Sequence, residues 1–157
     1  MRKLFMSMLA FVASVAALAQ NTETFKPYKN TALRLPSVPL VVSDPYFSIW
    51  SPYDKLTDGD TRHWTNDEKP LEGLLRVDGK TYRFMGSSER SASENSSSHA
   101  DVQTAKQKSV SVLATSTYYT FACGPVDLDV VFTAPMLIND YDLLSSPVNY
   151  ISYQVRS

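Results

Sequence analysis

The residues most able to do chemistry gather in one stretch, DPYFSIWSPYDKLTDGDTRHW, which spans positions 44–64. It holds both tryptophans of the chain, Trp50 and Trp64, together with Tyr53 and His63. Aromatic side chains with a polar edge suit a half-exposed surface, where they can stack on a sugar or a peptide. We therefore take Trp50, Tyr53, His63 and Trp64 as candidate ligand-binding residues. The alternative, which the size of aromatic side chains favours, is that this cluster packs in an ordinary core.

Acidic residues in the same stretch suggest a metal site as a second hypothesis. Asp54, Asp58 and Asp60 lie close to His63 in sequence, and hard cations bind several carboxylate oxygens. The spacing does not fit the EF-hand pattern, however, and no second histidine is near in sequence. Asp58 precedes a glycine, and this pair is typical of a solvated turn. We expect neither a metal ion nor a cofactor.

No catalytic residue is assigned from the sequence. The nucleophile elbow G-x-S-x-G, the P-loop and the dinucleotide fingerprint G-x-G-x-x-G are all absent. Glycoside cleavage requires two carboxylates at a defined separation, and nothing singles out such a pair. His99 lies in a serine-rich stretch that would not hold a base rigidly. Cys123 occupies an alternating position in TYYTFAC and is expected to be a buried apolar side chain rather than a nucleophile.

The first residues, 1–19, are expected to be a secretory signal peptide, MRKLFMSMLAFVASVAALA. A basic start is followed by an apolar run that is too short to span a bilayer, which needs about 20 apolar residues. We therefore expect an exported protein, periplasmic or extracellular, with no membrane association after cleavage. Loss of Arg2 and Lys3 reduces the 15 basic residues to 13, against 16 acidic ones. This balance provides no basic surface for a nucleic acid.

The elements that must position the aromatic cluster are expected to be short strands. Residues 20–31 are polar and lack apolar periodicity, so we expect an exposed leader, with order beginning near Leu33. Four prolines between positions 36 and 52 exclude a helix there. The aromatic and β-branched residues of 39–42 and 46–50 instead favour strands.

The stretch GLLRVDGKTYRFMG, residues 73–86, carries the clearest local signal. Asp78 and Gly79 separate two runs of alternating polarity, and this dipeptide tolerates the positive φ angles of a two-residue type I′ turn. The sequence therefore predicts a β-hairpin with one apolar and one solvated face. Leu75, Val77, Tyr82 and Phe84 are expected on the apolar face, and Arg76, Lys80 and Arg83 on the solvated face.

A serine-rich connector, residues 87–101, divides the chain, because it contains no large apolar residue whose burial would offset the entropy of ordering. Before it lies an amino-terminal β module, residues 32–86. After it, residues 102–157 are predicted to be almost wholly strand, in the runs 109–115, 117–123 and 126–134.

The last third of the chain carries the pattern of a sheet. In the run 126–134, valine and leucine alternate with Asp127 and Asp129, which predicts one solvated face. A further strand begins near Val148, and the sequence stops inside it. We therefore expect the chain to be the amino-terminal part of a longer protein or a truncated gene product. The predicted fold is mainly β: a small β-hairpin module followed by an incomplete antiparallel β-sandwich.

Long segments of the chain resemble a known family. The segments RLPSVPLVVSDPYFSIWS, from Arg34, and TRHWTNDEKPLEGLLRVDGKTYRFMG, from Thr61, resemble the amino-terminal module of secreted glutaminase A-like proteins, a domain of unknown function. The later segment TSTYYTFACGPVDLDVVFTAPMLINDYDLLSSPVNYISYQV, from Thr115, is similar to the start of the β-sandwich domain of that family. Together these segments cover nearly all of the chain after Leu33.

This resemblance implies a parent protein that hydrolyses L-glutamine to L-glutamate and ammonia outside the cytoplasm. Its catalytic groups are expected in a helical barrel beyond this sequence, and no catalytic motif of the family maps onto these residues. The resemblance thus implies a structural role, with the carboxy-terminal domains of the same parent protein as partners. One alternative is an extracellular carbohydrate- or peptide-binding β module that uses the aromatic residues of 46–64. A hydrolase formed by this chain alone is the least favoured alternative.

Overall fold

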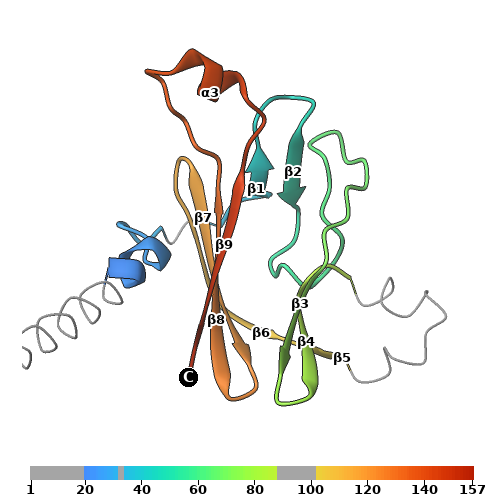
Figure 1. Ribbon diagram of the computed structural model, residues 1–157. Helices are drawn as coiled ribbons and strands as arrows, with labels where there is room; N and C mark the ends of the chain where they lie inside the picture. Colours follow the sequence, from blue (N-terminus) through green and yellow to red (C-terminus); the bar gives the residue numbers. More distant parts are fainter. Residues whose placement is uncertain (1–19, 32–33, 88–101) are drawn as a thin grey trace, which may run out of the picture.

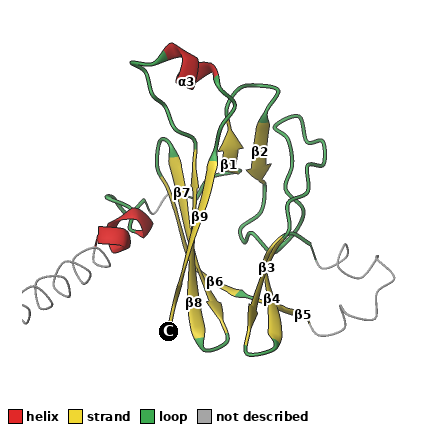
Figure 2. Cartoon of the chain, in the orientation of Figure 1, coloured by secondary structure: helices red, strands yellow, loops and turns green. Residues whose placement is uncertain are grey.

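The computed structural model describes residues 20–31, 34–87 and 102–157 (Figure 1). The predicted signal peptide and nearly all of the predicted connector lie outside these residues. Within them the fold is mainly β, as predicted, and Figure 2 shows strands as the dominant element. The strands of the three described sheets are β1 (Val38–Val42) and β2 (Ser48–Ser51); β3 (Gly73–Val77), β4 (Lys80–Met85) and β5 (Val102–Thr104); and β6 (Lys106–Val112), β7 (Ser116–Cys123), β8 (Val126–Thr133) and β9 (Tyr150–Arg156).

The hairpin predicted around Asp78 and Gly79 is confirmed. β3 and β4 pair antiparallel, and Val77 lies opposite Lys80 across the turn. The φ angles of Asp78 and Gly79 are 48° and 80°, and a type I′ turn requires positive values at both positions. β5 then pairs with β4 in parallel, which the sequence did not indicate.

The prediction that Arg83 faces water is wrong, because only 4% of this residue is exposed. Alternation correctly places Arg83 on the side of β4 opposite Tyr82, but that side is covered by loop residues. The Arg83 guanidinium donates hydrogen bonds to the carbonyl oxygens of Thr57 and Gly86. The predicted apolar face is confirmed, since all its members belong to the core or pack against it: Leu75, Val77, Tyr82 and Phe84.

The strands predicted in the last third of the chain are confirmed, and β6 to β9 form an antiparallel sheet in sequence order. The predicted solvated face is wrong for Asp129, which is 5% exposed. Its carboxylate accepts hydrogen bonds from Arg156 Nε at 2.6 Å and from Thr120 Oγ1 at 2.8 Å. Burial of a carboxylate is tolerated when it is paired and hydrogen-bonded in this way. The neighbouring strands β7 and β9 therefore replace water around Asp129.

The leader is ordered earlier than predicted. A 3₁₀ helix, η1 (Gln20–Phe25), precedes the segment that contacts β6. Thr31 Oγ1 donates to the carbonyl oxygen of Val112 at 3.1 Å and accepts from its backbone N–H at 3.2 Å. Ser111 Oγ donates to the Lys29 carbonyl oxygen at 3.4 Å. The leader is thus attached to β6, although some of its side chains are exposed as predicted, including Tyr28 at 85%.

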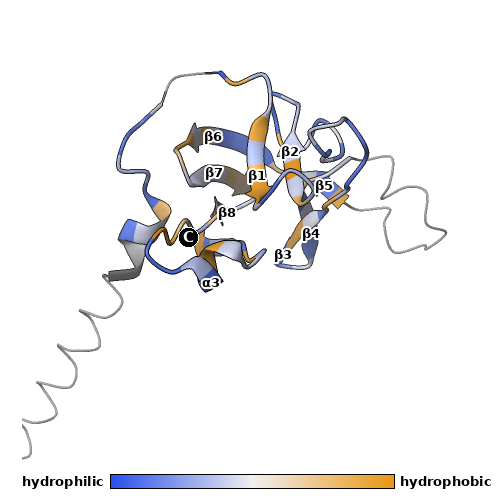
Figure 3. Cartoon of the chain, turned by 90° about the horizontal axis from the view of Figure 1, so that it is seen from above, coloured by the Kyte–Doolittle hydropathy of each residue, from blue (hydrophilic) through white to orange (hydrophobic). Residues whose placement is uncertain are grey.

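Residues from both sides of the predicted connector form one hydrophobic core. The rings of Phe84 and Phe121 lie 5.6 Å apart, and those of Phe121 and Tyr119 stack at 5.7 Å. Cys123, as predicted, is buried. In Figure 3 the apolar colour of β1 marks the strand that contributes Val38 and Leu40. The buried members of this core are Val38, Leu40, Leu56, Tyr82, Met85, Ala105, Tyr119, Phe121, Cys123, Leu128, Val130 and Phe132.

A short helix, α3 (Tyr141–Ser145), lies between β8 and β9 (Figure 1). Its N-cap is Asp140, whose side chain accepts a hydrogen bond from the backbone N–H of Leu143 at 3.0 Å. None of the helix residues is buried. Across the described ranges, no helix has the length and apolar character needed to cross a membrane.

We expect Phe132→Ala to lower the free energy of unfolding by about 3–5 kcal/mol, because it leaves a cavity in the core. Phe132 is 1% exposed, whereas Ile151, directly opposite on β9, is 51% exposed. The matched control Ile151→Ala should therefore cost less than about 1 kcal/mol. Urea denaturation of both variants measures the difference, and equal losses would contradict this description of the core.

Burial raises the pKa of the Tyr119 hydroxyl well above its ordinary value. The folded chain therefore keeps a proton that the unfolded chain loses above about pH 10. We expect stability from this group to be intact below that pH and to decline as the pH rises further. Tyr119→Phe should flatten the decline measured by urea denaturation in alkaline buffers. The control Tyr153→Phe, at a residue that is 72% exposed, should leave the slope unchanged.

Candidate functional site

Three of the four candidate ligand-binding residues line one hollow of about 310 Å³. Trp50, His63 and Trp64 are brought together there, but Tyr53 does not line it. We call this space the aromatic hollow. Its other lining residues are Ser37, Pro52, Arg62 and Asn66.

Trp50 is positioned by backbone hydrogen bonds between β2 and the loop that follows. The Trp50 N–H donates to the Arg62 carbonyl oxygen at 2.7 Å, and the Arg62 N–H donates back at 2.8 Å. The indole Nε1 donates to Ser48 Oγ. Trp50 is half-buried, so one part of the ring packs while another part borders the hollow. Trp50 is therefore in part a packing residue, and its role in ligand binding stays a prediction.

His63 and Trp64 are held by one carbonyl oxygen of the preceding loop. Pro45 O accepts hydrogen bonds from His63 Nε2 at 2.9 Å and from Trp64 Nε1 at 2.6 Å. The two rings lie 5.6 Å apart at an angle of 43°. Trp64 remains 62% exposed, so it is not a core residue. Sequence reasoning missed the role of Pro45, because a backbone carbonyl leaves no mark in the side-chain pattern.

Both ring nitrogens of His63 are engaged. Nε2 faces a carbonyl oxygen and must donate, while Nδ1 accepts from the Thr65 N–H at 3.3 Å. Thr65 Oγ1 also lies 2.8 Å from Nδ1 and donates to Asp67 Oδ2 at 2.7 Å. These hydrogen bonds fix the loop around both ring nitrogens of His63.

Tyr53 lies near Arg62, which lines the aromatic hollow. A side-chain hydrogen bond with Tyr53 is the largest effect that raises the pKa of Arg62. Arg62 also donates to the Asn66 carbonyl oxygen at 3.0 Å and to Glu68 Oε1 at 3.3 Å. Arg62 was not among the predicted site residues, although it directly precedes His63 and is the cation that borders the hollow.

The acidic residues of this stretch do not converge on a common point. Asp54 pairs with Arg34 at 2.7 Å, and the Arg34 guanidinium lowers the pKa of that carboxyl. Asp58 Oδ2 accepts from the Lys55 N–H at 3.2 Å, and Asp60 Oδ1 from the Ser87 N–H at 3.1 Å. In the part of the chain that the structure describes, no group of three His, Cys, Asp or Glu residues is placed to bind a metal.

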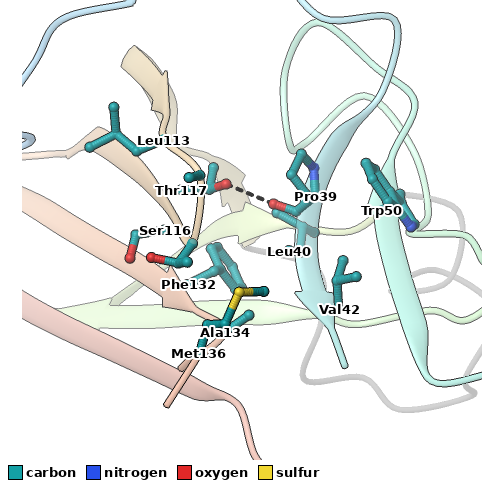
Figure 4. Close-up of a pocket in the computed structure, with 12 residues that line it drawn as sticks. Pro39, Leu40, Val42, Trp50, Leu113, Ser116, Thr117, Phe132, Ala134 and Met136 are labelled. Carbon is teal, nitrogen blue, oxygen red and sulfur yellow. Dashed lines mark hydrogen bonds between the residues drawn. The ribbon is translucent and has the colours of Figure 1, made fainter. Parts of the chain in front are cut away.

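A second cavity, of about 220 Å³, lies between β1 and the β6–β7 turn (Figure 4). Thr117 Oγ1 donates to the Pro39 carbonyl oxygen at 2.7 Å and joins the two sides. Trp50 borders this cavity as well as the aromatic hollow. None of its lining residues is titratable, so the cavity suits an apolar group and not acid or base chemistry. The lining consists of Pro39, Leu40, Val42, Trp50, Leu113, Ala114, Thr115, Ser116, Thr117, Phe132, Ala134 and Met136.

Exposed apolar side chains form a further feature on β9. In an antiparallel pair, directly opposite residues share one face of the sheet. Three β9 residues thus lie on the face that forms the core, yet they are 44–72% exposed. We call them the β9 apolar face: Ile151 opposite Phe132, Tyr153 opposite Val130, and Val155 opposite Leu128.

The fold and these sites define a mainly β protein with a partly exposed aromatic cluster and exposed apolar side chains on β9. The family described as Domain of unknown function (DUF4964) matches residues 10–93, which is more than half of the chain. The chain therefore belongs to this family. A second family, Domain of unknown function (DUF5127), matches residues 115–157.

Comparison with curated proteins finds similarity to Glutaminase A of Aspergillus oryzae (strain ATCC 42149 / RIB 40). The two sequences are 28% identical over 163 residues, which cover 98% of this chain and 21% of the relative. The chain thus spans about a fifth of the length of the relative. The predicted resemblance to the amino-terminal region of glutaminase A-like proteins is confirmed. No solved structure matches the chain.

We expect the two tryptophans of the aromatic hollow to differ in their contribution to stability. Trp50→Ala should lower the free energy of unfolding by about 2–3 kcal/mol, because it removes a half-buried ring. Trp64→Ala should cost about 1 kcal/mol, the contribution of one hydrogen bond, since its ring is largely exposed. Urea denaturation measures both values. A loss for Trp64→Ala as large as that for Trp50→Ala would show that Trp64 is a packing residue.

Proposed function

We propose that this chain forms the non-catalytic amino-terminal portion of an exported glutaminase A-like protein. The parent protein would hydrolyse L-glutamine to L-glutamate and ammonia in the periplasm or outside the cell. The role of this portion is structural: it supports a helical catalytic domain of the same polypeptide. The similarity to a relative about five times as long, called Glutaminase A, supports this assignment.

The observation that carries the proposal is the β9 apolar face. On β8 the opposite residues Leu128, Val130 and Phe132 are each 1% exposed, because the core covers them. On β9 the same face of the same sheet carries apolar side chains without such a cover among the described residues. Exposed apolar surfaces of this kind are typical of contacts with another protein segment.

The surroundings of His63, Cys123 and Asp54 support a non-catalytic role. Both nitrogens of His63 are occupied by the loop that holds it. Burial of Cys123 and the nearby charge of Asp127 raise the pKa of its thiol, which disfavours the nucleophilic thiolate. Asp54 has its own ion-pair partner. These groups therefore serve the fold.

A chimaera tests the structural role. The region of the Aspergillus oryzae Glutaminase A that matches this chain is replaced by the chain itself. We expect the chimaera to be soluble and to release ammonia from L-glutamine, while this chain alone releases none. The paired substitution Ile151→Lys and Tyr153→Lys should reduce the soluble, active yield by at least about tenfold, because it places two charges in an apolar contact.

The control for the chimaera is Tyr28→Lys. Tyr28 is 85% exposed and lies outside the β9 apolar face, so this substitution should leave yield and activity unchanged. If the β9 variant is as soluble and active as the unsubstituted chimaera, the proposed support by β9 is wrong. Ammonia release by the isolated chain would show that the chain itself is catalytic.

A carbohydrate- or peptide-binding module is the second candidate function. The observation that favours it is the grouping of Trp50, His63 and Trp64 around one hollow. Trp64 presents most of its surface to solvent, as a ring that stacks on a ligand must. For this function, soluble oligosaccharides or peptides should change the tryptophan fluorescence, and Trp64→Ala should abolish the response without unfolding the chain.

A further inference from the structure

Arg83 is a cation almost completely removed from water. Its guanidinium donates to the carbonyl oxygens of Thr57, at 3.2 Å, and Gly86, and to Thr104 Oγ1 at 3.2 Å. All three acceptors are neutral. Burial of a charge is costly unless it is paired, and the ion pairs found among the described residues do not include Arg83. Among the described residues, no carboxylate therefore compensates the buried positive charge of Arg83.

Arg83 lines a hollow of about 360 Å³, which we call the Arg83 pocket. Lys55 and Lys106 also line it, and both are exposed residues. The carboxylate that lines it, Asp58, is engaged with the Lys55 N–H at 3.2 Å. Among the described residues that line the pocket, three are cationic and one is a carboxylate, so this lining has a net positive charge although the whole chain has a net charge of −1. Such local excess charge concentrates anions from solution.

We propose that the Arg83 pocket binds a small-molecule anion through a carboxylate or phosphate group. The guanidinium fork matches the oxygen geometry of both groups. Arg83 supplies the charge at the buried side of the pocket, and Lys55 and Lys106 add charge at its exposed side. The hydroxyls of Thr57 and Thr104 lie among the lining residues and offer further hydrogen bonds. The volume lies at the lower end of the range of about 300–1,000 Å³ for small-molecule sites.

Arg83 could instead act only as a clamp that joins the carbonyl oxygens of Thr57 and Gly86. The two roles differ in what they require of Lys55 and Lys106. A clamp needs neither lysine, because the hydrogen bonds of Arg83 go to other residues. An anion site needs them, because they carry two of its three positive charges. The lysines therefore provide the test, and their exposure makes unfolding on substitution unexpected.

The experiment is calorimetric titration of the full chain with inorganic phosphate and, separately, with succinate, at fixed ionic strength. We expect saturable binding of one or both anions at millimolar concentration. Each exposed charge pair contributes a factor of up to about five in affinity. The double variant Lys55→Met and Lys106→Met, which loses two such pairs, should therefore bind the anion about tenfold more weakly. The control Lys80→Met removes an exposed charge at the start of β4, outside the pocket. It should bind both anions with the same affinity as the unsubstituted chain.

A second variant, Arg83→Lys, keeps the charge and loses the planar fork. Its circular dichroism reports whether the fold is retained, and the folded variant should bind the preferred anion more weakly. Tighter binding of phosphate would assign the pocket to phosphate groups, and tighter binding of succinate to carboxylates. Absence of saturable binding of both anions would overturn the proposal. A double lysine variant that binds as tightly as the unsubstituted chain would also overturn it. The proposal is independent of glutaminase activity, so its failure leaves the proposed function unaffected.

Discussion

The structure depends on aromatic packing between the β3–β4 hairpin and β7. Phe84 contributes from the hairpin and Phe121 from β7, with ring centres 5.6 Å apart, and Phe121 is completely buried. The contact joins segments from the two matched families, so these segments share one core. The turn after β7 takes part as well: a Cβ at Gly124 would lie 2.3 Å from the Tyr82 hydroxyl oxygen. Glycine at this turn therefore permits the hairpin to approach, in addition to adopting its φ angle of 63°.

Two charged side chains, Asp129 and Arg83, are buried and are stabilised in different ways. Asp129 is paired with Arg156 of the edge strand, so its charge is compensated within the sheet. Arg83 is surrounded by neutral oxygens of the loop before β3 and of β5. The first arrangement is complete by itself, whereas the second leaves Arg83 without an anionic partner among the described residues, beside the Arg83 pocket. This difference is why one buried charge belongs to the fold and the other points to a ligand.

Local chemistry predicted the parts of the fold that depend on neighbouring residues. Asp78 and Gly79 specified their turn, and alternation in TYYTFAC placed Cys123 in the core. Alternation failed for Arg83 and Asp129, because it predicts on which side a residue lies and not what covers that side. The aromatic hollow was anticipated in its residue types. Its geometry was not, since it depends on the carbonyl oxygen of Pro45 and on the backbone pairing of Arg62 with Trp50.

The exposed apolar side chains of β9 also have a consequence for its dynamics. The strand is paired with β8 from Tyr150, opposite Thr133, to Arg156, opposite Asp127, but its side chains contribute little buried area. Segments with few buried contacts open locally at a free-energy cost well below that of global unfolding. The amide hydrogens of β9 should therefore exchange with solvent while the inner strands β7 and β8 stay protected. That opening also breaks the ion pair between Arg156 and Asp129 and uncovers a carboxylate that is buried in the closed sheet.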